Sequence, residues 1–301
     1  MLSQHVSTRR FHLAAASSLV LAALILTGCS TDETPEASAQ EAFAHIHGLA
    51  FDPHDDQLAV ATHEGIYKLD DDADTLTVSG PIGDLDIDAM GFTLVNGTAY
   101  ASGHPGPNTP QSFGAPHLGL ISSTDQGETW TTVSLAGAVD FHALAVDRYK
   151  PETIYGLSSS DSTVYRSDDA GNSWQKGAEL TARDLAAPPN SSGNVYATTD
   201  AGLARSSDGG ATFQLVPDAP ALFLISNDGA QDGRLVGVDT DGVIWRQSAG
   251  EGGWVQEGTV EGNPQAMTVE PSTTRLVIAD DRGIAVTEDY GRTWSILQPA
   301  L

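Results

Sequence analysis

The stretch Ser123–Trp130, with the sequence STDQGETW, decides the fold because it recurs three more times in the chain. The copies are SDDAGNSW at Ser167–Trp174, SSDGGATF at Ser206–Phe213 and TEDYGRTW at Thr287–Trp294. All four share the pattern Ser/Thr-x-Asp-x-Gly-x-Ser/Thr-aromatic. Chance rarely repeats so long a pattern, so the chain is built from a repeated structural unit.

The spacing within the pattern predicts a hairpin turn that is held by its own side chains. An Asp in a tight turn accepts hydrogen bonds from nearby backbone N–H groups. The Gly two residues later allows a positive φ, and the aromatic residue begins a new strand that packs under the turn. We therefore predict that the aspartates of the pattern fasten hairpins and do not catalyse: Asp125, Asp169, Asp208 and Asp289.

The repeated pattern resembles the Asp-box (BNR) repeat of the sialidase-like β-propeller superfamily, and the resemblance covers the chain from about Ala44 onward. In that superfamily the turn joins the third and fourth strands of a blade, away from the active face. Bacterial lipoproteins with this repeat are often classed as glycosyl hydrolases or exo-alpha-sialidases on the repeat alone. The resemblance thus implies a propeller with structural turns and leaves the activity open.

Units of about 40 residues predict the blades, and each begins with a short apolar strand. Apolar alternation, with Gly, Asp and Pro between the segments, favours strands over helices. Four strands in each of six units predict an all-β, six-bladed propeller with four-stranded antiparallel blades over residues 44–301. The first strands are expected at 47–52, 88–93, 142–147, 183–188, 222–226 and 265–270. Blades one and five lack the pattern, with Asp70–Asp74 and Gly250–Trp254 in its place.

The N-terminal residues 1–28 read as a lipoprotein signal peptide. Arg9 and Arg10 precede the apolar segment Phe11–Leu26, and Leu26–Cys29 matches a bacterial lipobox. We expect lipid attachment at Cys29 and a location on the extracytoplasmic face of a bacterial cell membrane. Residues 29–43 are rich in Ser, Thr, Pro, Ala and acids, which predicts a flexible linker before the propeller.

The charge balance argues against a nucleic-acid partner. The chain has 40 acidic and 14 basic residues, for a net charge of −26, and such a surface repels phosphates. With the single Cys29, no internal disulfide is possible. The expected contacts are the membrane, through the lipid, and a carbohydrate or protein ligand; we expect a monomer.

Alignment of the repeats places histidines at one mouth of the central channel. Residues two apart on a strand share a face, and the turn after each second strand opens on the same end of the propeller. The histidines at these positions all come from blades one to three: His45, His47, His63, His104 and His142. Asp86, Asp88 and Asp140 lie among them. Imidazole with carboxylate suits zinc or copper, and a substrate site without metal fits the same residues.

Sialidase chemistry is disfavoured because no arginine triad can be assembled. Arg183 is the only Arg on the inner ring of aligned positions, and other arginines fall at the repeated turns. Another glycoside hydrolase would use Asp86, Asp88 and Asp140 as catalytic candidates, on the expectation that neighbouring acids raise one another's pKa.

Two functional hypotheses follow from the sequence. The first is a lipid-anchored propeller that binds a ligand, metal ion or partner at a His/Asp-rich channel mouth. The alternative is a glycoside hydrolase of the sialidase-like class that is not a typical sialidase.

Overall fold

A computed structural model describes residues 43, 45–51, 57–72, 75–189, 193–230, 232–249 and 253–300. The chain divides into two units, Met1–Glu36 and Ala37–Leu301, and all described residues belong to the second. The predicted signal peptide, Cys29 and all of the linker except Phe43 lie outside the described residues. Within the described part, no helix is long and apolar enough to cross a membrane.

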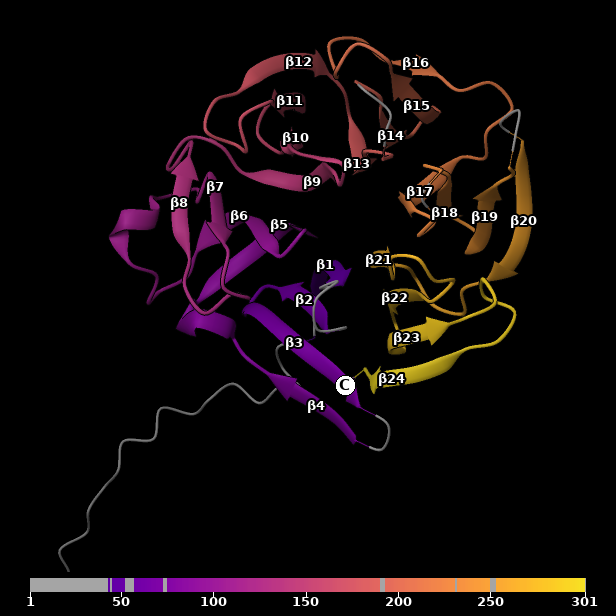
Figure 1. Ribbon diagram of the computed structural model, residues 1–301, viewed down its shortest axis with the longest axis horizontal. Coiled ribbons are helices and arrows are strands. Elements are labelled where there is room, and N and C mark those ends of the chain that lie inside the picture. Colours follow the sequence, from indigo (N-terminus) through magenta and orange to yellow (C-terminus); the bar gives the residue numbers. More distant parts are fainter. Residues whose placement is uncertain are drawn as a thin grey trace, which may run out of the picture. The chain divides into compact units, whose positions relative to one another are not determined.

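The described residues form six four-stranded antiparallel sheets arranged as a ring (Figure 1), which confirms the predicted six-bladed propeller. Blade one contains β1 (Ile46–Phe51), β2 (Leu58–Thr62), β3 (Gly65–Asp72) and β4 (Thr75–Ser79). Blade two contains β5 (Ile87–Val95), β6 (Thr98–Pro105), β7 (Leu120–Ser123) and β8 (Thr131–Ser134). Blade three contains β9 (Phe141–Asp147), β10 (Lys150–Ser158), β11 (Thr163–Ser167) and β12 (Gln175–Glu179).

The second half of the ring repeats this order, with each strand paired to its neighbour in sequence. Blade four contains β13 (Ala182–Ala186), β14 (Val195–Thr199), β15 (Gly202–Ser206) and β16 (Gln214–Leu215). Blade five contains β17 (Leu222–Asn227), β18 (Leu235–Asp239), β19 (Val243–Gln247) and β20 (Trp254–Thr259). Blade six contains β21 (Ala266–Val269), β22 (Leu276–Asp280), β23 (Gly283–Thr287) and β24 (Ser295–Pro299). Two short 3₁₀ helices, η1 (Ile82–Asp84) and η2 (Gln111–Phe113), lie in connections.

The ring closes by side-chain packing between blades six and one. The strands β1 and β24 each pair within their own blade. Apolar side chains of β1 and β2, including Ile46 and Val60, share a core cluster with Val277 and Ile284 of blade six. In addition, the Ile46 N–H donates to Gln265 Oε1 at 3.3 Å. Burial of apolar surface therefore joins the first and last blades.

Each copy of the repeated pattern forms the same hydrogen-bonded turn. In Ser123–Trp130, the Ser123 hydroxyl donates to Asp125 Oδ1 and accepts the Gly127 N–H, both at 2.8 Å. The Thr129 N–H and hydroxyl donate to the two oxygens of Asp125, at 2.9 and 2.6 Å. The same bonds recur in Ser167–Trp174, Ser206–Phe213 and Thr287–Trp294.

The glycine of each repeated turn contacts the part of the chain that precedes its blade. Gly127 has a φ of 88°, and a Cβ there would collide with Ile82 in the connection after blade one. A Cβ at Gly171, whose φ is 86°, would collide with Leu120 of blade two. Trp174, at the end of the same turn, donates from Nε1 to Ser134 Oγ of blade two at 3.0 Å. The turns therefore fasten neighbouring blades, and the positive φ is the main reason that glycine is needed in them.

We predict that the repeated turns make the stability of the protein fall steeply at acid pH. Side-chain and backbone hydrogen bonds from the turn hold the pKa of Asp125, Asp208 and Asp289 at about 2, below the ordinary 3.8. A carboxylate with a lowered folded-state pKa stabilises the fold above its unfolded pKa and loses that contribution as the pH falls toward 2. Melting temperature, followed by circular dichroism from pH 6 to pH 2, should show this fall.

The matched variant is Asp125→Asn. It should melt a few degrees below the wild-type protein at pH 6, and the difference should shrink as the pH falls toward 2, where Asp125 itself becomes protonated. A difference that stays the same at every pH would contradict the assigned role of the ionised carboxylate.

Candidate functional site

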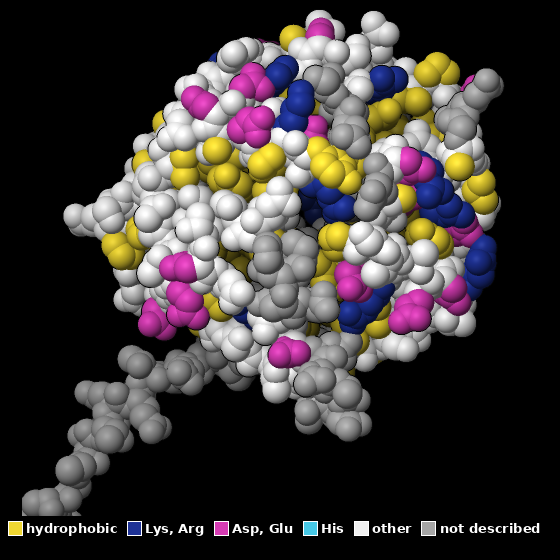
Figure 2. All heavy atoms as spheres, in the orientation of Figure 1, with side chains coloured by type: hydrophobic (Ala, Val, Ile, Leu, Met, Phe, Trp, Pro, Cys, Tyr) yellow, Lys and Arg dark blue, Asp and Glu magenta, His cyan; other side chains and the backbone are white. Residues whose placement is uncertain are grey.

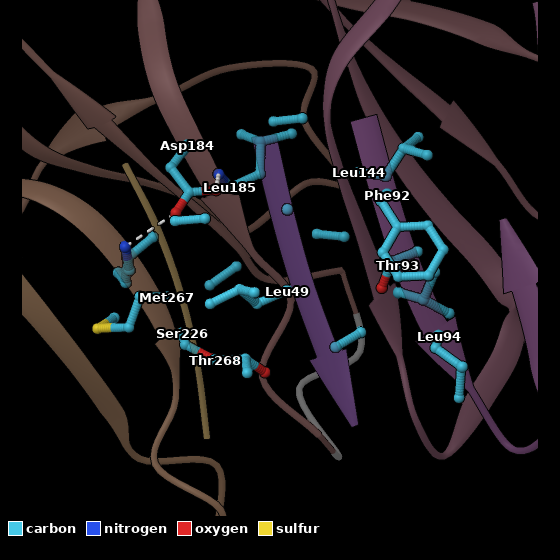
Figure 3. A pocket seen from close by; sticks show the side chains of 18 of the residues that line it. Leu49, Phe92, Thr93, Leu94, Leu144, Asp184, Leu185, Ser226, Met267 and Thr268 are labelled. Atoms are coloured by element: carbon cyan, nitrogen blue, oxygen red, sulfur yellow. Dashed lines mark hydrogen bonds between the residues drawn. The ribbon is translucent and has the colours of Figure 1, made fainter. Parts of the chain in front are cut away.

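The inner strands enclose a central cavity of about 310 Å³, into which Figure 3 looks. Its wall receives one apolar residue from each blade, at equivalent positions: Leu49, Met90, Leu144, Leu185, Leu224 and Met267. Polar residues line the cavity at the starts of the inner strands, where they include His47, His142 and Arg183. Others line it toward the ends of the same strands, where they include Thr93, Ser226 and Thr268. The cavity thus has an apolar wall between two polar ends, and the end at the starts of the inner strands is the mouth.

Asp184 joins two of the inner strands in the wall of this cavity (Figure 3). Its carboxylate accepts the Leu185 N–H at 2.8 Å and the Ile225 N–H of β17 at 3.0 Å. Burial raises the pKa of Asp184, and these backbone bonds oppose that rise. The carboxylate therefore satisfies backbone donors at the boundary between blades four and five.

A first group of titratable side chains lies at the boundary between blades one and two. His63 Nδ1 lies 2.8 Å from Asp88 Oδ1, and His47 Nε2 lies 3.4 Å from the same oxygen. The rings of His47 and His63 meet edge to face with centroids 4.4 Å apart. The His47 Nε2 atom is buried and makes no hydrogen bond. Two imidazoles from β1 and the β2–β3 turn thus converge on one carboxylate oxygen from β5.

A second group lies at the boundary between blades two and three. His142 Nε2 and His104 Nε2 lie 2.7 and 3.3 Å from Asp140 Oδ2. The Asp140 side chain is only 1% exposed, whereas both histidine side chains are 39% exposed. Ser159 Oγ also donates to Asp140 Oδ2 at 2.9 Å. A buried carboxylate is therefore covered by two imidazoles that face the solvent.

The long connection between β6 and β7 holds His104 and brings His117 beside it. The Leu118 N–H donates to the Gly103 carbonyl at 2.9 Å, so the ends of this connection meet. The rings of His104 and His117 lie with centroids 5.3 Å apart, and His117 Nδ1 is buried without a hydrogen-bond partner. His117 was not predicted from the sequence, because only the closure of this loop brings it near the mouth.

The structure divides the predicted histidine cluster into two groups of two. Among the described residues, the groups able to hold a metal are His47, His63 and Asp88, and His104, Asp140 and His142. His45 belongs to neither group; its ring packs edge to face on His63 with centroids 5.1 Å apart. Asp86 instead holds the β6–β7 connection, since its Oδ2 accepts the Asn108 N–H at 3.2 Å.

The expectation that neighbouring acids raise one another's pKa is wrong for two of the three candidates. Burial raises the pKa of Asp88, but His47 and His63 more than compensate and leave it below the ordinary value. Burial likewise raises the pKa of Asp140, but its contacts with His142, Ser159 and His104 lower it by more, so that it lies below the ordinary value. Each acid has imidazoles as its nearest partners, so both carboxylates are held ionised.

Blades four and six contribute different groups to the mouth. Arg183 donates from Nη2 to the Gln265 carbonyl at 3.1 Å, and its guanidinium lies over the Phe223 ring at 5.2 Å. Figure 2 shows one face of the molecule, on which acidic and basic side chains are visible.

Comparison with known proteins gives a partial relative and several structural neighbours; no protein-family model matches the chain. A xyloglucanase from Hypocrea jecorina (strain QM6a) is 36% identical over 138 residues, which are 44% of this chain and 16% of that enzyme. The crystal structure of an ancestral GH74 enzyme matches with a TM-score of 0.52 and 15% identity, over 86% of this chain and 39% of that chain. A chain in the crystal structure of a nidogen/laminin complex matches with a TM-score of 0.57 and 15% identity, over 77% of this chain and 89% of that chain.

These comparisons support a β-propeller like those of glycoside hydrolases. The chain spans only a minor part of the xyloglucanase and of the ancestral GH74 enzyme. The structural neighbours share the fold at low identity, which does not transfer an activity. Of the two hypotheses from the sequence, the comparisons favour the glycoside hydrolase.

We predict that Asp184 stabilises the cavity wall through its hydrogen bonds. Asp184→Ala leaves the N–H groups of Leu185 and Ile225 without this acceptor, which should cost about 1–3 kcal/mol of unfolding free energy for each buried donor. Asp184→Asn keeps a side-chain oxygen and should retain most of the stability. Urea unfolding of the three proteins measures the difference, and equal losses in both variants would show that the acceptor oxygen does not matter.

Proposed function

We propose that this propeller is a glycoside hydrolase-like protein that acts on a β-glucan polysaccharide of the xyloglucan kind at its His/Asp-rich mouth. The observation that carries the proposal is the 36% identity with a xyloglucanase over 138 residues. The polar mouth above the cavity supports it, because polysaccharide hydroxyls bind to such donors and acceptors.

In this proposal the ionised carboxylates and the imidazoles have different catalytic roles. Asp88 and Asp140 are held ionised, so they suit a general base or the stabilisation of positive charge at the anomeric carbon. Proton delivery to the leaving oxygen falls to an exposed imidazole, His63 or His104, because histidine is a common general acid in enzymes. This division differs from the paired carboxyl groups of most glycosidases.

Hydrolysis of xyloglucan by the purified protein tests the proposal. The wild-type protein should release reducing ends, and Asp88→Asn and Asp140→Asn should each lower kcat/KM by roughly 10²–10⁴-fold. Asp200→Asn is the matched control, because Asp200 is an exposed acid at the turn after β14, and it should retain the wild-type rate. Absence of product from xyloglucan and from unsubstituted β-glucans, with a folded protein, would remove the enzymatic proposal.

A second candidate function is ligand binding without turnover. Asp88 and Asp140 both have lowered pKa values, so neither is held protonated as the acid that glycosidases use. The same xyloglucan sample distinguishes the candidates: binding seen by calorimetry with no new reducing ends favours a binding protein. That the protein is a monomer without a nucleic-acid partner remains a prediction.

We also propose that the propeller is anchored by lipid at Cys29 on the extracytoplasmic face of the membrane, and that its repeated turns are Asp-boxes. The lipobox Leu26–Cys29 supports the anchor, and the pattern from Ser123 to Trp130 supports the Asp-box assignment. Both assignments rest on sequence patterns, and Cys29 lies outside the described residues.

The anchor is tested by labelling expressing bacteria with a radioactive fatty acid. The wild-type protein should carry the label and sediment with membranes, whereas Cys29→Ser should carry none, because the thiol is the attachment point. Label that persists in Cys29→Ser would contradict the assignment.

A further inference from the structure

We propose that the mouth contains two adjacent binding sites for a divalent transition-metal ion of the zinc class. One site is formed by His47, His63 and Asp88, and the other by His104, Asp140 and His142. Each group offers two imidazole nitrogens and one carboxylate oxygen. The proposal goes beyond the carbohydrate function and does not depend on it.

The spacing of the donor atoms fits the ligand shell of such an ion. When each ligand is about 2.0–2.1 Å from zinc, neighbouring ligands of a tetrahedral site lie about 3.3 Å apart. The His47–Asp88 and His104–Asp140 distances are 3.4 and 3.3 Å. The His63–Asp88 and His142–Asp140 distances, 2.8 and 2.7 Å, need only a small separation to admit the ion.

The orientation of His104 points to a cation beside Asp140. His104 Nδ1 lies 3.2 Å from the Pro116 carbonyl oxygen, which can only accept, so Nδ1 carries the hydrogen. Nε2 is then the ring nitrogen aimed at Asp140 Oδ2, at 3.3 Å, and it is the atom that would ligate a cation there. A backbone carbonyl that orients a ligating histidine in this way is common at metal sites.

Burial of Asp140 supports the same conclusion independently. Its side chain is 1% exposed, and its Oδ1 atom is buried without a hydrogen-bond donor. A buried carboxylate costs free energy unless it is paired, and the partners on its second oxygen are two histidines and the Ser159 hydroxyl. A divalent ion bound at Asp140 Oδ2 would offset this charge more fully than neutral imidazoles do.

The two sites are linked through one pair of strands. Asp88 of β5 pairs directly with His104 of β6, so a residue of each site stands opposite a residue of the other. The His63, His104 and His142 side chains are 41%, 39% and 39% exposed. Each ion would therefore have protein ligands beneath it and a position open to water, as at catalytic rather than structural zinc sites.

Titration of the metal-stripped protein with zinc chloride tests the proposal. The protein is treated with chelator, dialysed, titrated by calorimetry and analysed for bound zinc by mass spectrometry. We expect two zinc ions per wild-type chain, one in His63→Ala, one in His142→Ala and none at these sites in the double variant. His63→Asn and His142→Asn, which keep a polar side chain, serve if an alanine variant does not fold, as judged by circular dichroism.

The matched control is His45→Ala, which removes an exposed histidine that packs on His63 but belongs to neither group. It should bind two zinc ions. A wild-type stoichiometry other than two, undiminished binding in the double variant, or loss of zinc in His45→Ala would each overturn the proposal. The titration contains no carbohydrate, so failure to hydrolyse xyloglucan leaves this result unaffected.

Discussion

The hydrogen-bonded turn that recurs in four of the six described blades, with its glycine against the preceding part of the chain, is the constraint on which the spacing of those blades depends. At Gly127 and Gly171 a Cβ would collide with Ile82 and Leu120, and both glycines have positive φ. The turn can therefore dock closely only because the Asp and Ser/Thr side chains hold it in that conformation. The local hydrogen bonds of the turn thereby fix the spacing between neighbouring blades.

The candidate site lies at the blade boundaries that these turns fasten. The group around Asp88 spans blades one and two, the boundary at which Gly127 meets Ile82. The group around Asp140 spans blades two and three, where Gly171 meets Leu120. Each group takes ligating side chains from both sides of its boundary, so distances of about 3 Å between donor atoms require a fixed blade spacing. The repeated turns have a structural role and the mouth a functional one, but both require the same fixed spacing between blades.

The repeat made the fold predictable from the sequence, because each copy of the pattern specifies the same local turn and sets the position of its blade. It also brought His47, His63, His104 and His142 to one mouth, since aligned strand positions share a face. It did not reveal that they would separate into two groups, because that depends on how far each blade is rotated from the next. His117 was missed because a loop closure, at Leu118 and Gly103, has no periodicity. The pKa directions of Asp88 and Asp140 were mispredicted because acids were counted without their imidazole partners.

The mouth constrains its ligand more than the fold does. The similarity to a GH74 enzyme is a similarity of the propeller fold, and this fold serves many functions. A ligand that enters this mouth meets the internal contacts of Asp88 and Asp140, in which each carboxylate already has two imidazoles as partners. A metal ion that lies between a carboxylate and its two imidazoles keeps all three side chains engaged, so this geometry suits a cation.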